Sequence, residues 1–214
     1  MYLKSENYKR RKIDELESTL CQNFDVICLS ETWLKPDIND SDIEIDGFTF
    51  YRKDRIGQRG GGVGIYVSDK LPHRYLPELE VNNLELIWCE VQLNSKSFLV
   101  GSLYFPPNQS AETVDNFILL LHQSVTLAFN RNPESIFLLG DFNDACASWD
   151  SDHFDSQFNL KLFDWIIRND LHQLISDPTY LTTTSANILD LIITDSPGYA
   201  MDSGTMAGAA GSHH

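Results

Sequence analysis

The chain has few basic side chains and no long hydrophobic run. Lys and Arg number 16 against 31 Asp and Glu, which leaves a formal net charge of −15 over 214 residues. Such a mean field repels a polyanion, so any binding of nucleic acid would depend on local basic groups or metal ions. No apolar run approaches the ~20 residues that span a bilayer, and residues 117–121 are typical of the longest. The sequence therefore predicts no contact with a membrane.

Cysteine is scarce, and its spacing favours neither a disulfide framework nor a zinc site. Cys21, Cys28, Cys89 and Cys146 form no C-x-x-C pair, and the second and third lie inside apolar strand patterns. We therefore expect free, buried thiols. The N-terminal residues lack the apolar core of a secretory signal, so the expected localisation is intracellular.

No composition break or internal repeat divides the chain. Hydrophobic residues make up 42% and charged residues 22%, which is typical of a globular domain with a sizeable core. We expect one domain over residues 1–196. Residues 197–214 are mostly Gly, Ala and Ser with little to bury, and they are predicted to be a flexible tail.

Apolar patterns predict the main strands and helices. Helices are expected over residues 8–20, after a capping Ser110 and around residues 158–166. Residues 94–97 are typical of a hairpin turn between two of the strands. The predicted strands cover residues 24–30, 48–51, 65–67, 84–93, 98–104, 136–139 and 188–193.

Residues 60–64, Gly-Gly-Gly-Val-Gly, allow two interpretations. Phosphate-binding glycine loops follow a strand and open a helix, whereas Ile65 continues this run as a strand. We therefore predict a glycine-rich turn inside a hairpin rather than a nucleotide loop. The only dense basic cluster of the sequence stands just before it and consists of Arg52, Lys53, Arg55 and Arg59.

The most informative stretch is residues 136–143, Ile-Phe-Leu-Leu-Gly-Asp-Phe-Asn. The four apolar residues predict a buried strand, and Gly140 is expected to allow a sharp turn where that strand ends. Asp141 and Asn143 then share a face, while Phe142 points into the core. The carboxylate can accept a proton from water and the amide can donate to an anionic oxygen. The alternative is an Asx-type turn with no chemical role.

Three further polar residues stand within or directly after apolar strands, namely Glu31, Tyr104 and Asp190. Burying even a neutral polar group without a partner costs about 2–7 kcal/mol, so acids at several strand ends are expected to converge on a shared site. Converging carboxylates indicate a divalent cation, and oxygen ligands favour Mg²⁺ or Mn²⁺ over zinc. With a hydroxyl and an amide as donors, such a site suits phosphoryl transfer.

Each of these residues also has a structural interpretation. Glu31 could cap the turn at Thr32, and Tyr104 could be an ordinary aromatic at a sheet edge. Asp190 could be satisfied by the hydroxyls of residues 182–185. Each alternative is reasonable for one residue alone, but all of them together are a weaker explanation than a shared site.

The motifs occur in the order seen in the endonuclease/exonuclease/phosphatase superfamily. They are Glu31-Thr32-Trp33-Leu34, Tyr104-x-Pro106-Pro107, Gly140-Asp141-Phe142-Asn143 and Leu189-Asp190-Leu191-Ile192. More narrowly, the chain resembles the apurinic-type endonuclease domain of non-LTR (LINE-type) retrotransposons. Arg52-Lys53-Asp54-Arg55 followed by Gly60-Gly61-Gly62-Val63 is similar to that group as well. The resemblance extends from about residue 13 to about residue 204.

The resemblance implies an α/β (α+β) fold, a four-layer αββα sandwich of two packed mixed sheets. It also assigns roles to residues. Glu31 would ligate Mg²⁺ (or Mn²⁺), Asp141 would orient or deprotonate the attacking water, and Tyr104 and Asn143 would hold the phosphate. Asp190 would orient a histidine of a later Ser-Asp-His motif. DNA would contact the basic cluster Arg52, Lys53, Arg55 and Arg59.

Both ends of the chain depart from the family pattern, so we expect a terminal strand to be missing at each end. Ser5 and Asn7 stand near the place of the asparagine that the family carries on its first strand. Residues 211–214, Gly-Ser-His-His, stand where Ser-Asp-His is expected, and His213 is either a remnant of that motif or part of a tag. Ser-Asp-His at residues 151–153 precedes the Asp190 strand and is interpreted as coincidence.

Three functions follow as hypotheses. The first is an Mg²⁺-dependent DNA endonuclease that nicks one strand and leaves a 3′-hydroxyl, which primes a reverse transcriptase domain of the same polyprotein in the nucleus. The second is a phosphatase of phosphorylated small molecules on the same fold, which suits the acidic charge. The third is a catalytically impaired fragment without an enzymatic role. The basic cluster and glycine run favour the first, and the unmatched ends favour the third.

Overall fold

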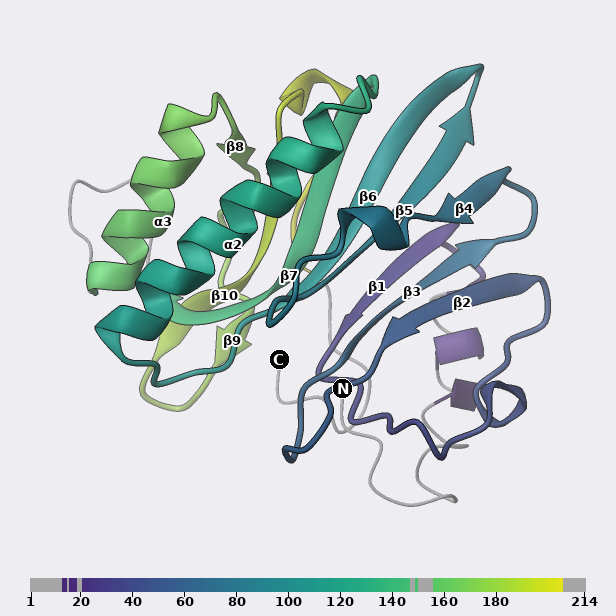
Figure 1. Ribbon diagram of the computed structural model, residues 1–214, viewed down its shortest axis with the longest axis horizontal. Helices are drawn as coiled ribbons and strands as arrows, with labels where there is room; N and C mark the ends of the chain where they lie inside the picture. The colour runs from purple at the N-terminus through teal and green to yellow at the C-terminus, as the bar shows by residue number, and fades with distance from the viewer. Residues whose placement is uncertain (1–12, 15, 19–20, 147–148, 150–155, 206–214) are drawn as a thin grey trace.

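Two β-sheets pack face to face, and helices cover the outer face of the larger one (Figure 1). The computed structural model describes residues 13–14, 16–18, 21–146, 149 and 156–205. Short 3₁₀ helices lie in the connections, at η1 (Asp40–Asp42), η2 (Pro77–Leu79) and η3 (Pro197–Tyr199). No helix among these residues has the length and apolarity that crossing a membrane would require.

The smaller sheet is antiparallel and has the strand order β1-β3-β2. Its central strand is buried along its whole length. Residues 13–14 and 16–18 are helical, and Ile13 and Leu16 pack on the outer face of this sheet beside Tyr66. The described residues of the helix expected over 8–20 thus lie outside the smaller sheet. The three strands are β1 (Val26–Ser30), β2 (Phe48–Lys53) and β3 (Val63–Ser68).

The larger sheet has seven strands and is mixed. Its order is β4-β5-β6-β7-β10-β8, with β9 paired to β10. Only β6 and β7 pair in parallel among the described strands, and helix α2 forms the crossover between them, as parallel pairing requires. The strands are β4 (His73–Tyr75), β5 (Glu85–Leu93), β6 (Lys96–Tyr104), β7 (Ser135–Cys146), β8 (His172–Gln173), β9 (Tyr180–Leu181) and β10 (Ala186–Thr194).

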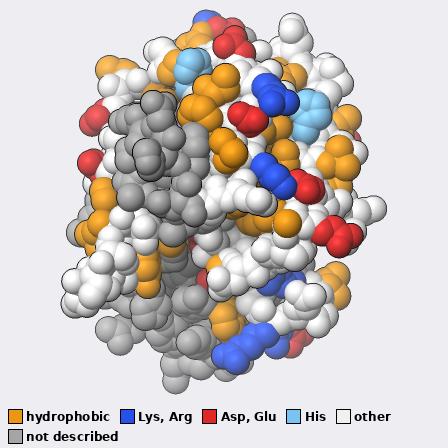
Figure 2. Space-filling view, turned by 90° about the vertical axis from the view of Figure 1, so that its left-hand side faces the viewer, with side chains coloured by type: hydrophobic (Ala, Val, Ile, Leu, Met, Phe, Trp, Pro, Cys, Tyr) orange, Lys and Arg blue, Asp and Glu red, His pale blue; other side chains and the backbone are white. Residues whose placement is uncertain are grey.

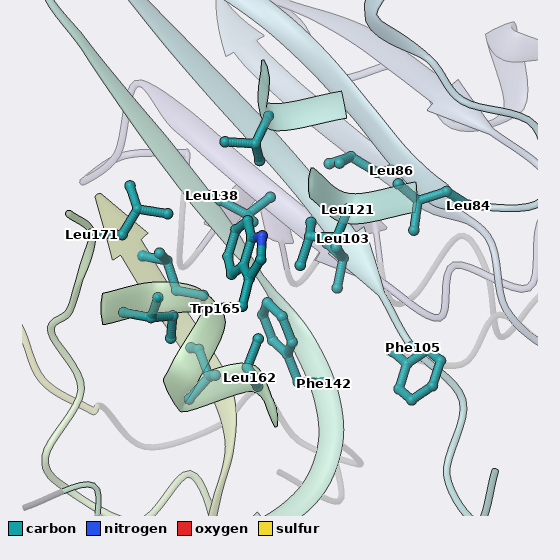
Figure 3. Close-up of a cluster of buried hydrophobic side chains, with 14 of the residues drawn as sticks. Leu84, Leu86, Leu103, Phe105, Leu121, Leu138, Phe142, Leu162, Trp165 and Leu171 are labelled. Atoms are coloured by element: carbon teal, nitrogen blue, oxygen red, sulfur yellow. The ribbon is translucent and has the colours of Figure 1, made fainter. Parts of the chain in front are cut away.

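Helices α2 (Ala111–Phe129) and α3 (Gln157–Arg168) cover the larger sheet. Each begins at a serine cap, because Ser110 accepts a hydrogen bond from the Thr113 amide and Ser156 accepts one from the Asn159 amide. Their buried faces and the sheet form one apolar cluster (Figure 3). Its labelled members are Leu84, Leu86, Leu103, Phe105, Leu121, Leu138, Phe142, Leu162, Trp165 and Leu171.

A second apolar layer fills the space between the two sheets. Val63, Ile65 and Val67 of the smaller sheet pack there against Ile87 and Cys89 of the larger one. Cys21, Cys28 and Cys89 are free thiols, as the sequence predicts. Burial raises the pKa of Cys28 and of Cys89 to about 12, so both are inert thiols rather than thiolates.

Gly140 is required for a different reason from the sharp turn that the sequence suggests. Strand β7 does not end there but continues through Asp141 and Asn143. A methyl group on Gly140 would lie 2.0 Å from the Leu103 carbonyl oxygen, so the glycine permits close approach of β6 and β7. The irregularity comes later, where Asn143 has a φ of 51° and the register with β10 shifts between Ile188 and Asp190.

Both predicted hairpins are confirmed, whereas the predicted tail begins too early. Asn94 and Ser95 have φ values of 51° and 65° between β5 and β6, as a tight two-residue turn requires. Residues 60–62 lie in the turn between β2 and β3. Residues 197–199, expected to belong to a flexible tail, form η3, and the Tyr199 ring packs edge-on against Phe98.

Candidate active site

Three of the predicted site residues lie side by side on neighbouring strands. Tyr104 of β6 pairs with Asp141 of β7, which pairs with Asp190 of β10. Directly paired residues point to the same face of a sheet. Tyr104 belongs to the layer between the sheets, while Phe142 belongs to the cluster beneath the helices. The row Tyr104–Asp141–Asp190 therefore faces the smaller sheet.

Glu31 joins this row from the smaller sheet. It follows directly on β1, and the Tyr104 hydroxyl donates a 2.5 Å hydrogen bond to its Oε1 atom. The preceding Ser30 fixes β1 against the larger sheet. Its hydroxyl donates to the Leu103 carbonyl oxygen at 2.9 Å and accepts from the Asp141 amide at 3.2 Å. The structure thus brings Glu31, Tyr104, Asp141 and Asp190 together at one end of the layer between the sheets.

The Tyr104 hydroxyl is a permanent hydrogen-bond donor. The side chain is only 3% exposed. Burial raises the pKa of Tyr104 far above its usual range, and the hydrogen bond to Glu31 and the charges of Glu31 and Asp141 raise it further. The Arg55 guanidinium acts in the opposite direction but does not outweigh them. A neutral phenol beside carboxylates can donate to an anionic oxygen without adding negative charge.

Asn143 is tied to the catalytic candidate Asp141. Its amide N–H donates to Asp141 Oδ1 at 2.9 Å, which is the Asx-type bond that the sequence allowed as an alternative. This bond holds the Asp141 carboxylate in one orientation, so the turn and a chemical role are compatible. Asn143 also lines a cavity of about 380 Å³, together with Gln109 and Lys161.

The backbone around Glu31 is strained. Glu31 and Trp33 have φ values of 53° and 56°, in a region that costs a residue other than glycine about 1–3 kcal/mol. Two hydrogen bonds hold this conformation, from the Thr32 amide to the Gly62 carbonyl (3.1 Å) and from the Trp33 amide to the Gly61 carbonyl (2.9 Å). The glycine-rich turn thus positions the segment that carries Glu31.

Glu85 is a site-supporting residue that the sequence interpretation missed. It pairs with Tyr104 across β5 and β6, accepts a 2.6 Å hydrogen bond from the Gly62 amide and forms an ion pair with Arg55. The Arg55 guanidinium in turn lies 5.3 Å from the centre of the Tyr104 ring. The sequence pattern that identified Glu31 also applies to Glu85, because both are acids at the border of an apolar strand.

Carboxylates of the chain already engage most of the predicted DNA-binding cluster. On the face seen in Figure 2, basic and acidic side chains are interspersed among the coloured atoms. Arg59 differs from the other cluster members, because its guanidinium lies 5.3 Å from the centre of the Trp33 ring and forms no ion pair with the described residues. The ion pairs are Arg52 with Asp40 and Asp54, Lys53 with Glu80, and Arg55 with Glu85.

The structural alternatives for the acids find limited support. The hydroxyl of Thr182 bonds to Ser185, and it is Thr179 whose hydroxyl accepts from the Asp190 amide. Ser5, Asn7, the Ser-Asp-His of residues 151–153 and His213 lie outside the described residues. Within the described part of the chain, no group of three His, Cys, Asp or Glu side chains forms a ready metal cage.

Comparison with known proteins assigns the family. The sequence profile of the endonuclease/exonuclease/phosphatase family matches residues 6–206. The chain belongs to this family. Its members are hydrolases that act on phosphate esters, phosphodiester bonds among them. A search among curated protein sequences finds no significant match.

Solved structures with a similar fold include several nucleases. The endonuclease domain of TRAS1, a telomere-specific non-LTR retrotransposon, is 16% identical with a TM-score of 0.64, covering 90% of this chain and 81% of that one. The AP endonuclease LMAP from Leishmania major is also 16% identical, with a TM-score of 0.67 and coverages of 91% and 77%. A point variant of the 3′ phosphatase NExo from Neisseria, bound to a product DNA hairpin, is 15% identical, with a TM-score of 0.63 and coverages of 90% and 84%. The α/β sandwich predicted from the sequence is thus confirmed for this member of the endonuclease/exonuclease/phosphatase family.

Proposed function

We propose that the protein is a divalent-metal-dependent DNA endonuclease that nicks one strand and leaves a 3′-hydroxyl. The observation that carries the proposal is the row Glu31–Tyr104–Asp141–Asp190. Residues from four strands and both sheets meet there, and a 2.5 Å hydrogen bond links the first two. Carboxylates that a fold holds close together repel one another unless a cation or a proton reduces their charge. A metal ion bound in a phosphodiesterase would supply that cation.

The residues present fit Mg²⁺ or Mn²⁺. Enzymes of this family in general use divalent metals, and the site offers the oxygen donors that hard cations prefer. Glu31 is the ligand that we propose, since its Oε1 accepts from Tyr104 and leaves Oε2 for a metal. A site with fewer than three such protein ligands suits Mg²⁺, which keeps several waters and binds substrate phosphate. When bound, the ion would neutralise developing charge on the phosphate.

The remaining side chains have distinct tasks in this proposal. Asp141 orients the attacking water and accepts its proton, with its carboxylate held by the Asn143 amide. Tyr104 stays protonated and donates to a phosphate oxygen once substrate competes with Glu31 for its hydroxyl. The Asn143 side-chain amide is a second neutral donor. Asp190 of β10 pairs with Asp141 of β7 and supports the same part of the sheet.

The biological setting is proposed from the same resemblance. The TRAS1 endonuclease domain comes from a non-LTR retrotransposon, and its fold matches this one. We infer a nick that supplies a primer end for a reverse transcriptase domain of the same polyprotein, acting on chromosomal DNA in the nucleus.

Plasmid nicking tests the proposal. Supercoiled plasmid with Mg²⁺ should be converted to the open circle by the wild type, and EDTA should abolish the conversion. Asp141→Asn, which keeps the size and a hydrogen-bond acceptor, should nick plasmid at least about 10²-fold more slowly. Asp164→Asn is the matched control, because Asp164 lies on the outer helix α3 and pairs with Arg168 there. Hydrolysis of inositol phosphates with intact plasmid would reject the endonuclease in favour of a phosphatase, and inactivity on both would reject an active enzyme.

A further inference from the structure

One side-chain hydroxyl joins the two sheets at the candidate active site. Ser30 is the last residue of β1, and β1 contacts both β6 and β7 of the larger sheet. The Ser30 hydroxyl donates to the Leu103 carbonyl oxygen at 2.9 Å and accepts a hydrogen bond from the Asp141 amide at 3.2 Å. A single oxygen atom of the smaller sheet is thus bonded to two neighbouring strands of the larger one.

The two partners of the Ser30 hydroxyl belong to the same rung of the β6–β7 ladder. Tyr104 pairs in parallel with Asp141, and the Phe105 amide donates to the Asp141 carbonyl at 2.9 Å. In parallel pairing of this kind, the Asp141 amide and the Leu103 carbonyl face each other on the other side of the rung. The Ser30 hydroxyl therefore contacts the ladder at the rung that carries Tyr104 and Asp141.

The same serine also fixes the backbone that carries Glu31. The two residues are joined by a peptide bond, and Glu31 follows β1 with a φ of 53°. On the other side of Glu31, the Thr32 amide donates to the Gly62 carbonyl at 3.1 Å. Because β1 and β7 belong to different sheets, the separation of Glu31 and Asp141 depends on side-chain contacts rather than on a backbone ladder.

A second serine joins the same two sheets at a greater distance along the strands. Ser102 of β6 is fully buried, and its hydroxyl donates to the Leu29 carbonyl oxygen of β1 at 3.2 Å. This bond connects β1 with β6, as one bond of Ser30 does, but it does not involve the rung of Asp141. Ser102 is therefore a matched control for the contribution of such a bond to stability alone.

We propose that Ser30 is a positioning residue whose hydroxyl sets the separation of Glu31 and Asp141 for the reaction. Glu31 is the proposed metal ligand and Asp141 the proposed proton acceptor, so both have to be placed relative to one phosphate. A displacement of about 1 Å in such an arrangement lowers a rate by as much as about 10²-fold. The inference rests on the proposed nuclease function and adds to it a residue that acts through two others.

Steady-state plasmid nicking separates positioning from stability. Ser30→Ala should lower kcat about 10- to 100-fold with a nearly unchanged KM for DNA, because the groups that contact substrate remain. Ser30→Thr, which keeps the hydroxyl and suits a strand, should restore most of the rate. Ser102→Ala should lower the melting temperature about as much as Ser30→Ala does but keep the kcat of the wild type. Equal kcat per folded molecule in the two alanine variants would overturn the positioning role.

Amide hydrogen exchange followed by NMR tests the contact without depending on catalysis. In Ser30→Ala the Asp141 amide loses an acceptor, so it should exchange about 2- to 13-fold faster than in Ser102→Ala, the value of one hydrogen bond. Equal exchange at Asp141 in the two variants would overturn the inference. If the wild type does not nick plasmid, the nuclease proposal fails, and the exchange rates still decide whether Ser30 positions Asp141.

Discussion

Two aspartates of the β7–β10 pair differ in the surroundings of their carboxylates. Asp195 directly follows β10, and its Oδ1 accepts hydrogen bonds from the Ser135 hydroxyl at 2.7 Å and the Ile136 amide at 2.9 Å. Asp141 lies beside the register shift, where it pairs with the acid Asp190 across the strands and with Tyr104, which contacts a third acid.

This difference separates a structural acid from a catalytic candidate. Asp195 is surrounded by donors, so its charge is stabilised and the strand ends are held together. Asp141 is 3% exposed, and further acids lie beside it, Asp190 across the strands and Glu31 through Tyr104. An acid near the end of a strand is therefore a weak sign of function by itself, and a buried acid beside further acids is a stronger one.

The largest effect should come from exchanging the two aspartates for asparagine. Asp141→Asn removes the proton acceptor and should lower the nicking rate about 10²- to 10⁴-fold with little change in stability. Asp195→Asn should leave the rate per folded molecule unchanged and lower the free energy of unfolding by about 1 kcal/mol. Single-turnover nicking and urea unfolding of both variants make the comparison. An equal loss of nicking rate in both variants would mean that Asp141 and Asp195 do not differ in their roles.

Tyr104→Phe sharpens the contrast at the catalytic end. The change removes one hydrogen bond to a charged group, which corresponds to about a 10- to 150-fold lower rate. Because the pKa of Tyr104 is raised, the wild type should show no decline in rate from ionisation of this hydroxyl up to about pH 10, the usual tyrosine value. A pH–rate profile of both proteins provides the check. A wild-type profile that falls with a tyrosine-like pKa, and is flat in the variant, would contradict the assignment.

Glu85→Gln tests whether a supporting acid behaves like Asp195 or like Asp141. The amide can still accept from the Gly62 amide but loses the charge that holds Arg55. We expect about a tenfold lower kcat, an unchanged melting temperature and a larger loss for Glu85→Ala. Steady-state kinetics with kcat and KM determined separately distinguish the outcomes. A change in melting temperature with full activity would make Glu85 a structural acid only.

The smallest effect is expected at Glu90, whose carboxylate, like that of Asp195, accepts hydrogen bonds from neighbouring donors. Burial acts to raise its pKa, but hydrogen bonds from Ser97 and Arg74 and the charges of Arg74 and Arg131 lower it overall. A pKa that is lower in the folded state gives stability above the unfolded value of about 4.3, and this stability is lost as pH falls below it. Glu90→Gln should therefore destabilise at about pH 7, and its difference from the wild type in urea unfolding should shrink as pH falls below about 4.3. A constant difference across this range would refute the linkage.

Local patterns predicted most of the elements and the residues of the row. Ser110 as a cap, the tight turn at Asn94 and the glycine-rich hairpin depend on short-range backbone preferences, which a sequence displays directly. Glu31, Tyr104, Asp141 and Asp190 were found because a polar residue beside an apolar strand is costly unless it has a partner.

What the sequence did not predict depends on pairing between distant segments. The reason for Gly140 is a contact with Leu103 of another strand, and no local pattern encodes it. The carboxylate partners of Arg52 and Lys53 come from separate loops, so a cluster that is basic in sequence is largely neutralised in space. The left-handed backbone of Glu31 likewise depends on hydrogen bonds to the turn at residues 61–62.

The contact of Gly140 with Leu103 has a practical consequence for protein engineering. Gly140 permits the close spacing of the Tyr104 and Asp141 backbones, because a Cβ at position 140 would lie 2.0 Å from the Leu103 carbonyl oxygen. Transplanting Asp-Phe-Asn onto another parallel strand pair would reproduce the side chains but not their separation. The smallest portable unit of this centre therefore includes the glycine and the neighbouring strand.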